Sequence, residues 1–231
     1  DDDADVILNG QSSLDFFGTT VASAGDFNGD GIEDVLVSAY RDVGNGGGSG
    51  GGRVFIFFST INGTKRADAD ADVILNGQSG GNRFGSSAAS AGDFNGDGKD
   101  DVIVGAFNDA NGAASSNSGS AYIFFGGITG NKTARTDANV IIDGQNAGDE
   151  FGNAVASAGD FNGDGKDDVI IGAPTDDNNS NNNSGSAFIF FGGITGTKRA
   201  ADANVILDGQ SASDRFGISV ASAGDFNGDG K

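Results

Sequence analysis

Several residue types are absent from this sequence of 231 residues, and their absence narrows the possible functions. There is no cysteine, which excludes disulfides, zinc–thiolate sites and thiol nucleophiles. There is no histidine either, so this chain cannot build a Ser–His or a Cys–His nucleophile. No apolar run is long enough to span a bilayer. We therefore expect a chain that is not itself an enzyme and that carries no transmembrane segment.

Basic residues are scarce. The sequence has 13 Lys and Arg against 33 Asp and Glu, which gives a net charge of −20. Phosphate contacts need clustered Lys and Arg, so nucleic acid is an unfavourable partner. Acidity alone is typical of a soluble, self-repelling surface. Here, however, many of the acidic residues gather in recurring loops, and this concentration favours a bound cation.

The sequence repeats itself with a long and nearly even period. The acidic string AGDFNGDGIED recurs with small changes at 24–34, 91–101, 158–168 and, cut short, 223–231. Its first Asp returns after 67, 67 and 65 residues, and the flanking apolar runs and a Phe-Gly pair return with it. A period this complete indicates a repeat architecture. Within the single segment 1–231, we expect repeats at about 5–71, 72–138 and 139–203, and a partial one at 204–231.

Each repeat is expected to form four short strands and no long helix. The runs are β-branched, small or continuously apolar, and Gly and polar clusters bound them. Four strands in a repeat of about 66 residues match the blade of a β-propeller, in which neighbouring blades bury each other's faces. The sequence therefore predicts an all-β fold of propeller-type blades with four antiparallel strands. A parallel β-helix is the alternative, although its coils are usually much shorter. In the first repeat the runs stand at 6–9, 19–26, 34–37 and 54–58.

The acidic loop has the pattern D-x-N-x-D-G-x-x-D. Oxygen atoms at positions 1, 3 and 5 converge when the chain curls, and Gly at position 6 permits the sharp bend, as in the first half of an EF-hand. An EF-hand also needs a bidentate Glu at position 12, where this chain has Val37, Val104 or Ile171. The loop is therefore not an EF-hand. Its last acid stands at position 9, where the second strand is expected to begin.

Calcium is the ion that this loop favours. The carboxylates, the Asn amide and the backbone carbonyl of position 7 would form an all-oxygen shell, which favours Ca²⁺ over zinc or copper. A plain hairpin turn is the alternative, since Asn-Gly and Asp-Gly are strong turn formers. Three carboxylates within nine residues would, however, repel one another without a counter-ion. The predicted ligands are Asp26, Asn28, Asp30, Ile32 and Asp34; Asp93, Asn95, Asp97, Lys99 and Asp101; Asp160, Asn162, Asp164, Lys166 and Asp168; and, in the truncated fourth loop, Asp225, Asn227 and Asp229.

Three motifs together resemble a known repeat family. The pair Phe84-Gly85, the acidic loop and the string GAP at 172–174 are similar to the FG-GAP repeats of integrin α-subunit β-propellers and their bacterial relatives. The resemblance covers nearly the whole chain. It implies a propeller in which the loop joins the first and second strands of a blade and holds Ca²⁺. The first two repeats depart from it, with SAY and GAF in place of GAP.

On this pattern the chain holds about three and a half blades. It begins with a fourth strand at 6–9, contains three whole blades and stops after one first strand, which makes fourteen strands. Propeller rings typically close with about 4–8 blades. We therefore expect either a segment of a longer chain or a chain that closes or polymerises through a neighbour's strands, as exposed sheet edges invite.

The favoured function is a calcium-stabilised structural or adhesion module, extracellular or at the cell surface, that contacts a protein partner or copies of itself. Calcium modules outside the cell bind with dissociation constants of about 10⁻⁴–10⁻³ M, and cytosolic calcium would leave such loops largely empty. A glycan-binding propeller is one alternative, which the absence of Trp and of repeated aromatics in the variable loops disfavours. A non-catalytic accessory domain of a larger secreted enzyme is the other.

Three further features have simpler interpretations. The Phe-rich runs are expected to form core between blades. The basic connections NGTKRADAD, GNKTARTD and GTKRAAD are expected to be solvated loops. The variable loops between second and third strands would emerge on one face, where flexible linker is favoured over a binding role.

Overall fold

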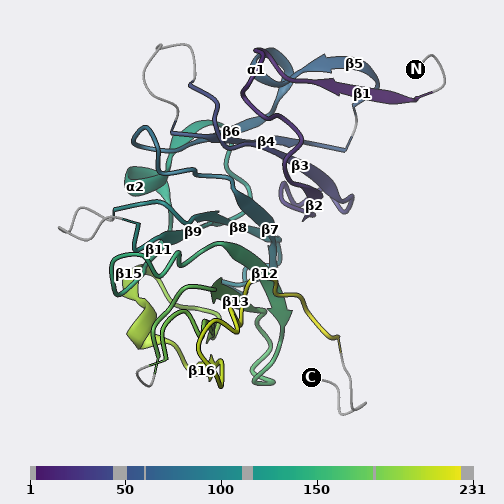
Figure 1. The fold of residues 1–231 in the computed structure, drawn as a ribbon. Helices are drawn as coiled ribbons and strands as arrows, with labels where there is room; N and C mark the ends of the chain where they lie inside the picture. Colours follow the sequence, from purple (N-terminus) through teal and green to yellow (C-terminus); the bar gives the residue numbers. More distant parts are fainter. Residues whose placement is uncertain (1–3, 44–50, 60, 111–116, 179–180, 225–231) are drawn as a thin grey trace.

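The computed structural model describes residues 4–43, 51–59, 61–110, 117–178 and 181–224. Its strands form four sheets that follow one another from the N-terminus to the C-terminus (Figure 1). The first is a parallel pair of β1 (Val6–Asn9) and β5 (Gly63–Arg66), and three larger sheets come after it. The predicted all-β fold of propeller-type blades is confirmed.

Each larger sheet contains a blade of four antiparallel strands, in which only the outermost strand comes from the following repeat. This exchange ties successive repeats together. The first blade consists of β2 (Val21–Gly25), β3 (Asp34–Ala39), β4 (Arg53–Phe57) and β6 (Val73–Asn76). The second consists of β7 (Ser87–Gly92), β8 (Asp101–Ala106), β9 (Ser120–Phe124) and β11 (Val140–Asp143). The third consists of β12 (Ala154–Gly159), β13 (Asp168–Ala173), β14 (Ser186–Phe190) and β16 (Val205–Asp208).

A fifth, parallel strand extends the first two blades. β10 (Gly130–Thr133) pairs with β6, and β15 (Gly196–Arg199) pairs with β11. The expectation that these connections are loops is therefore wrong, because backbone groups at the open edge of each blade find partners even where the side chains show no strand pattern. A short helical turn follows β5, β10 and β15: these are α1 (Ala67–Asp70), α2 (Ala134–Asp137) and η2 (Ala200–Asp202), respectively.

One predicted strand is missing. Residues 220–224, expected to be the first strand of a fourth blade, form no strand and are mostly exposed. In the other blades this strand pairs with the strand that follows the acidic loop. Of the helices in the described ranges, none has the length and apolar character needed to cross a membrane.

The hydrophobic core lies between neighbouring blades. Along β4, Val54 and Ile56 pack in the cluster shared with the second blade, while Phe55 and Phe57 pack in the cluster beside β1 and β5. The second and third blades share a similar cluster around Phe94. The Phe-rich runs are thus core, as predicted. The outer strand β16 of the third blade leaves Ile206 and Leu207 partly exposed.

Candidate metal-binding loops

Each acidic loop connects the first and second strands of its blade, as the resemblance implied. Just before the loop the register of the strand pair shifts, and a Gly with positive φ marks the bulge in every blade. A bulge bends and twists the strand that carries it. The first Asp of the loop therefore lies directly after a bend in the chain. The bulge glycines are Gly25, Gly92 and Gly159.

The first Asp of each loop organises the backbone around itself. Asp26 Oδ1 accepts hydrogen bonds from the amides of Gly29 and Asp30, both at 2.9 Å, and Asp26 Oδ2 accepts one from Gly31 at 2.8 Å. Asp93 and Asp160 make the same three contacts in their own loops, at 2.8–2.9 Å. One carboxylate thus holds the curl that the sequence pattern predicted.

The third, fifth and ninth residues of the loop face one another. Asn28 Nδ2 donates to Asp30 Oδ2 at 3.1 Å and to Asp34 Oδ1 at 3.3 Å. The corresponding distances are 3.0 and 3.3 Å in the second loop and 3.0 and 3.5 Å in the third. Two carboxylate oxygens therefore converge on one donor, whose partial positive charge offsets part of their repulsion.

The ninth Asp is the buried member of each loop. Asp34, Asp101 and Asp168 are at most 1% exposed, although each begins a strand beside open loop residues. Their Oδ1 atoms accept hydrogen bonds from the amides of Ser59, Gly126 and Gly192 at 2.8–3.0 Å. These donors follow the third strand of the same blade. The ninth Asp thus links the loop to that strand, a role that the loop pattern did not reveal.

Burial changes the acidity of these carboxyl groups. Desolvation raises the pKa of Asp101 to about 7, and the neighbouring Asp97 and Asp93 add to the increase, while two backbone amides oppose it. Desolvation raises the pKa of Asp34 and of Asp168 as well, again with nearby loop aspartates contributing. A positive counter-ion would stabilise all three as carboxylates.

The residues fit a hard divalent cation by their chemistry. Carboxylates from positions 5 and 9 already point at one atom, the Nδ2 of the Asn at position 3, and the position-9 carboxyl group is buried. Across the part of the chain that the structure describes, no three acidic side chains meet in an arrangement that would hold an ion as they stand. Turning the Asn amide would present its oxygen to the same point. Ligation by positions 1, 3, 5, 7 and 9 therefore stays a prediction, and Asp225, Asn227 and Asp229 lie outside the described residues.

A second polar cluster, which the sequence did not predict, lies at the opposite end of the strands. In the first blade Arg53 pairs with Asp42 at 2.6 Å, and both side chains are buried. In the second blade Arg135 reaches Asp143 at 2.8 Å and Asp109 at 3.4 Å. Each of these two blades thus pairs one arginine with aspartate. Each guanidinium also lies over an aromatic ring of the third strand of its blade.

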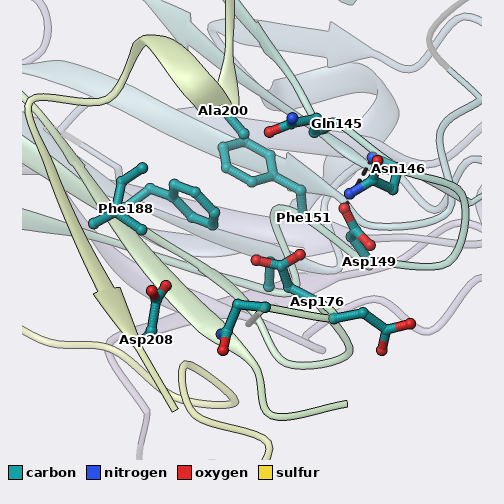
Figure 2. Close-up of a pocket in the computed structure, with 12 residues that line it drawn as sticks. Gln145, Asn146, Asp149, Phe151, Asp176, Phe188, Ala200 and Asp208 are labelled. Carbon is teal, nitrogen blue, oxygen red and sulfur yellow. Dashed lines mark hydrogen bonds between the residues drawn. The ribbon is translucent and has the colours of Figure 1, made fainter. Parts of the chain in front are cut away.

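The third blade has a cavity at the corresponding place. It encloses about 250 Å³, with the rings of Phe151 and Phe188 on one side and the carboxylates of Asp176 and Asp208 across from them (Figure 2). Ser186 stands where the first blade has Arg53, and Ala201 follows Ala200 as Arg135 follows Ala134. Burial and the negative charge of Asp208 raise the pKa of Asp176.

Comparison with known families identifies the repeat. The family model described as "FG-GAP repeat" matches residues 17–57, 84–124 and 151–190. Each matched region runs from the Phe of the Phe-Gly pair to the end of the third strand of a blade, so it contains one acidic loop.

Several curated proteins are similar to the chain over most of its length. Integrin alpha-PS5 of Drosophila melanogaster is 34% identical over 172 residues, which cover 73% of this chain and 16% of the relative. Integrin alpha-5 of Xenopus laevis is 30% identical over 72% of this chain and 15% of the relative. Phosphatidylinositol-glycan-specific phospholipase D of Rattus norvegicus is 34% identical over 68% and 18%, respectively. The chain thus spans less than a fifth of the length of these relatives.

Proposed function

The chain belongs to the FG-GAP repeat family, and on that premise we propose that it is a calcium-stabilised structural or adhesion module, extracellular or at the cell surface. Similarity to integrin α-subunits supports an adhesion-related module. In this proposal the module contacts a protein partner or copies of itself. Its chemistry is binding: calcium holds the blades in shape, and an exposed surface of the module contacts the partner.

The observation that carries the proposal is the buried ninth Asp of each loop. A carboxyl group at most 1% exposed and surrounded by further carboxyl groups is costly to ionise unless a cation accompanies it. The same arrangement occurs in three loops, each linked by a hydrogen bond to the third strand of its blade. Calcium at these loops would stabilise the carboxylates and, through them, the hairpin and the third strand together.

Calcium then acts as a structural element. With dissociation constants of about 10⁻⁴–10⁻³ M, roughly millimolar calcium would add about 0.4–1.4 kcal/mol per loop by mass action. Three loops would contribute a few kcal/mol in total, against a typical domain stability of about 5–15 kcal/mol. Such affinities suit the calcium concentrations found outside cells, which supports the proposed location.

Isothermal titration calorimetry tests calcium binding by the purified 231-residue chain. We expect at least three bound Ca²⁺ per chain, and one fewer in the variant Asp97→Asn, which removes one carboxylate of the second loop. Asp68→Asn is the matched control, because Asp68 lies outside the loops, in α1. Absence of binding at millimolar calcium, or equal stoichiometry in all three proteins, would exclude the calcium loops.

The match to a phospholipase D favours a second candidate, a non-catalytic accessory domain of a larger secreted enzyme. The proposal that this chain is not itself an enzyme rests on its lack of His and Cys. The purified chain should leave phosphodiester and glycosidic substrates unchanged. Turnover that disappears on substitution of a single Asp would overturn this part of the proposal. No further finding favours the glycan-binding alternative.

A further inference from the structure

Two positions of the acidic string distinguish the first repeat from the second and third. Positions 7 and 8 of the loop are Ile32-Glu33 in the first repeat, but Lys-Asp in both of the others. Every other residue of the string is the same in these three copies. The substituted positions lie between the fifth and ninth residues of the loop, where they could contact either the same loop or its neighbour.

The Asp at position 8 contacts the preceding loop. Asp100 Oδ2 accepts a hydrogen bond from the backbone amide of Asp26 at 2.7 Å, and the Asp100 amide donates to the Asp26 carbonyl at 3.2 Å. The third repeat does the same to the second: Asp167 Oδ2 accepts from the Asp93 amide at 2.8 Å, and the Asp167 amide donates to the Asp93 carbonyl at 3.3 Å. Two hydrogen bonds thus bridge each pair of neighbouring loops at the first Asp of the preceding loop.

Further contacts reinforce the bridge. A Cβ atom added to Gly29 would lie 2.9 Å from Lys99 Cε, so the position-7 side chain covers the preceding loop. The Gly127 amide donates to the Phe27 carbonyl at 2.6 Å, next to the Gly126 amide, which donates to Asp101. The equivalent bond from Gly193 to Phe94 measures 2.7 Å. One short segment therefore holds both the ninth Asp of its own loop and the backbone of the loop before it.

The first repeat shows what the other residues do at these positions. Glu33 accepts a hydrogen bond from Ser23 Oγ at 2.9 Å, within its own repeat. Ile32 is 54% exposed. Asp100 and Asp167 thus contact the preceding loop, whereas Glu33 contacts its own repeat.

We propose that the acidic loops are coupled in series: the position-8 Asp of each loop positions the first Asp of the preceding loop, so that a divalent cation bound at one loop raises the affinity of the loop before it. This inference rests on the proposed calcium function. An ion that fixes Asp101 also fixes the adjacent Asp100, and Asp100 holds the amide of Asp26, whose carboxylate organises the first loop. The preceding loop then loses less conformational entropy when it binds in turn. Thermodynamic linkage makes the effect reciprocal.

Hydrogen–deuterium exchange across a calcium titration can read each loop separately. Peptides covering 26–34, 93–101 and 160–168 of the full chain report the calcium midpoint of protection for each loop. In Asp100→Ala we expect the midpoint of the first loop to rise by about 5-fold or more, the low end of typical coupling between sites. The midpoint of the third loop should change less than that of the first, because the third loop is linked to the first only through the second, and its retained protection also shows that the variant is folded.

Matched variants distinguish the effect of losing the bridging hydrogen bonds from the effect of losing a negative charge. Glu33→Ala removes the acid at the same position of the first loop but leaves both bridges in place, so the calcium midpoints of the second and third loops should change less than that of the first. Asp167→Ala should raise the calcium midpoint of the second loop as well as that of the third loop, to which Asp167 belongs. Asp100→Asn keeps an acceptor oxygen without the charge, so the first loop should keep a midpoint near that of the unsubstituted chain.

A second route avoids the bridging residue altogether. Asp97→Asn weakens the second loop while Asp100 stays in place, and coupling predicts a raised midpoint in the first loop. Unshifted first-loop midpoints in both Asp100→Ala and Asp97→Asn, with protection by calcium otherwise intact, would overturn the coupling and leave the calcium function standing. If calcium protects no loop in the unsubstituted chain, the calcium function itself fails.

Discussion

At the scale of single residues, the ninth Asp of each loop combines two roles. It is a structural acceptor, because its carboxylate ties the loop to the end of the third strand. It is also a buried acid among other acids, which makes its charge costly. The two roles together explain why a proton or a cation should decide how stable each hairpin is.

The raised pKa values predict a specific pH dependence in chelator. Asp101 has a pKa of about 7 in the folded chain, above its ordinary value, so the folded state binds more protons than the unfolded state between about pH 4 and 7. The free energy of unfolding should therefore fall as pH rises through this window. Thermal melts in chelator should give a higher Tm at pH 5 than at pH 7.5.

Millimolar calcium should reduce or reverse this dependence, because the cation competes with protons for the same carboxylates. Asp101→Asn separates this effect from general charge repulsion, since the variant keeps most of the negative charge but lacks the carboxyl group whose pKa is raised to about 7. Its Tm should change less between pH 5 and 7.5 in chelator. An equal change in both proteins would assign the pH dependence to net charge alone.

At the scale of elements, the close approach of the second and third blades explains why the second blade has a glycine, Gly105, at the first position of the GAP motif. A Cβ atom added to Gly105 in β8 would lie 2.0 Å from the carbonyl oxygen of Gly152. The first blade has Ser38 in this place, fully buried, with its hydroxyl accepting a hydrogen bond from the Thr20 amide. The spacing between blades is therefore not uniform.

We expect Gly105→Ala to lower the free energy of unfolding by about 1–3 kcal/mol, because the methyl group overpacks a contact made with backbone. Urea denaturation in millimolar calcium measures the change. Ser38→Ala, which places the same residue in the first blade, should cost only about 1 kcal/mol through its lost hydrogen bond. Equal effects of the two substitutions would contradict the difference in spacing.

A substitution in the third blade should stabilise the folded chain. An arginine at position 201 would place a guanidinium near Asp176 and Asp208, as Arg135 does with Asp109 and Asp143 in the second blade. Ala201→Arg should therefore raise the Tm, whereas Ala201→Gln, of similar reach without charge, should not. A variant Ala201→Arg no more stable than Ala201→Gln would show that the cavity does not accept the charge. Differential scanning calorimetry at low ionic strength makes the comparison.

At the scale of the whole molecule, the parts that could be predicted from the sequence are those that depend on residue types recurring in each repeat. The apolar runs of each blade, the Phe core and the curl of the acidic loop all follow from residue type and spacing, and the structure has them where expected. The period makes each interpretation stronger, because an accidental pattern would not return after 67 residues.

The parts that could not be predicted arise from backbone pairing and from distant contacts. β10 forms because the edge of β6 offers partners, while its own sequence, GNKT, has no strand pattern. Residues 220–224 keep the strand sequence but form no strand. The bridge from Asp100 to Asp26 joins residues 74 positions apart, and the loop pattern alone does not predict it.

The central claim is that calcium holds this array of blades in a compact shape, and sedimentation velocity of the 231-residue chain tests it most directly. The chain would be run in chelator and then in millimolar calcium, with millimolar magnesium as the control for ionic strength and charge. The account predicts a larger sedimentation coefficient in calcium alone, from a more compact chain or from its assembly with further copies. The same profile in chelator, magnesium and calcium would contradict it.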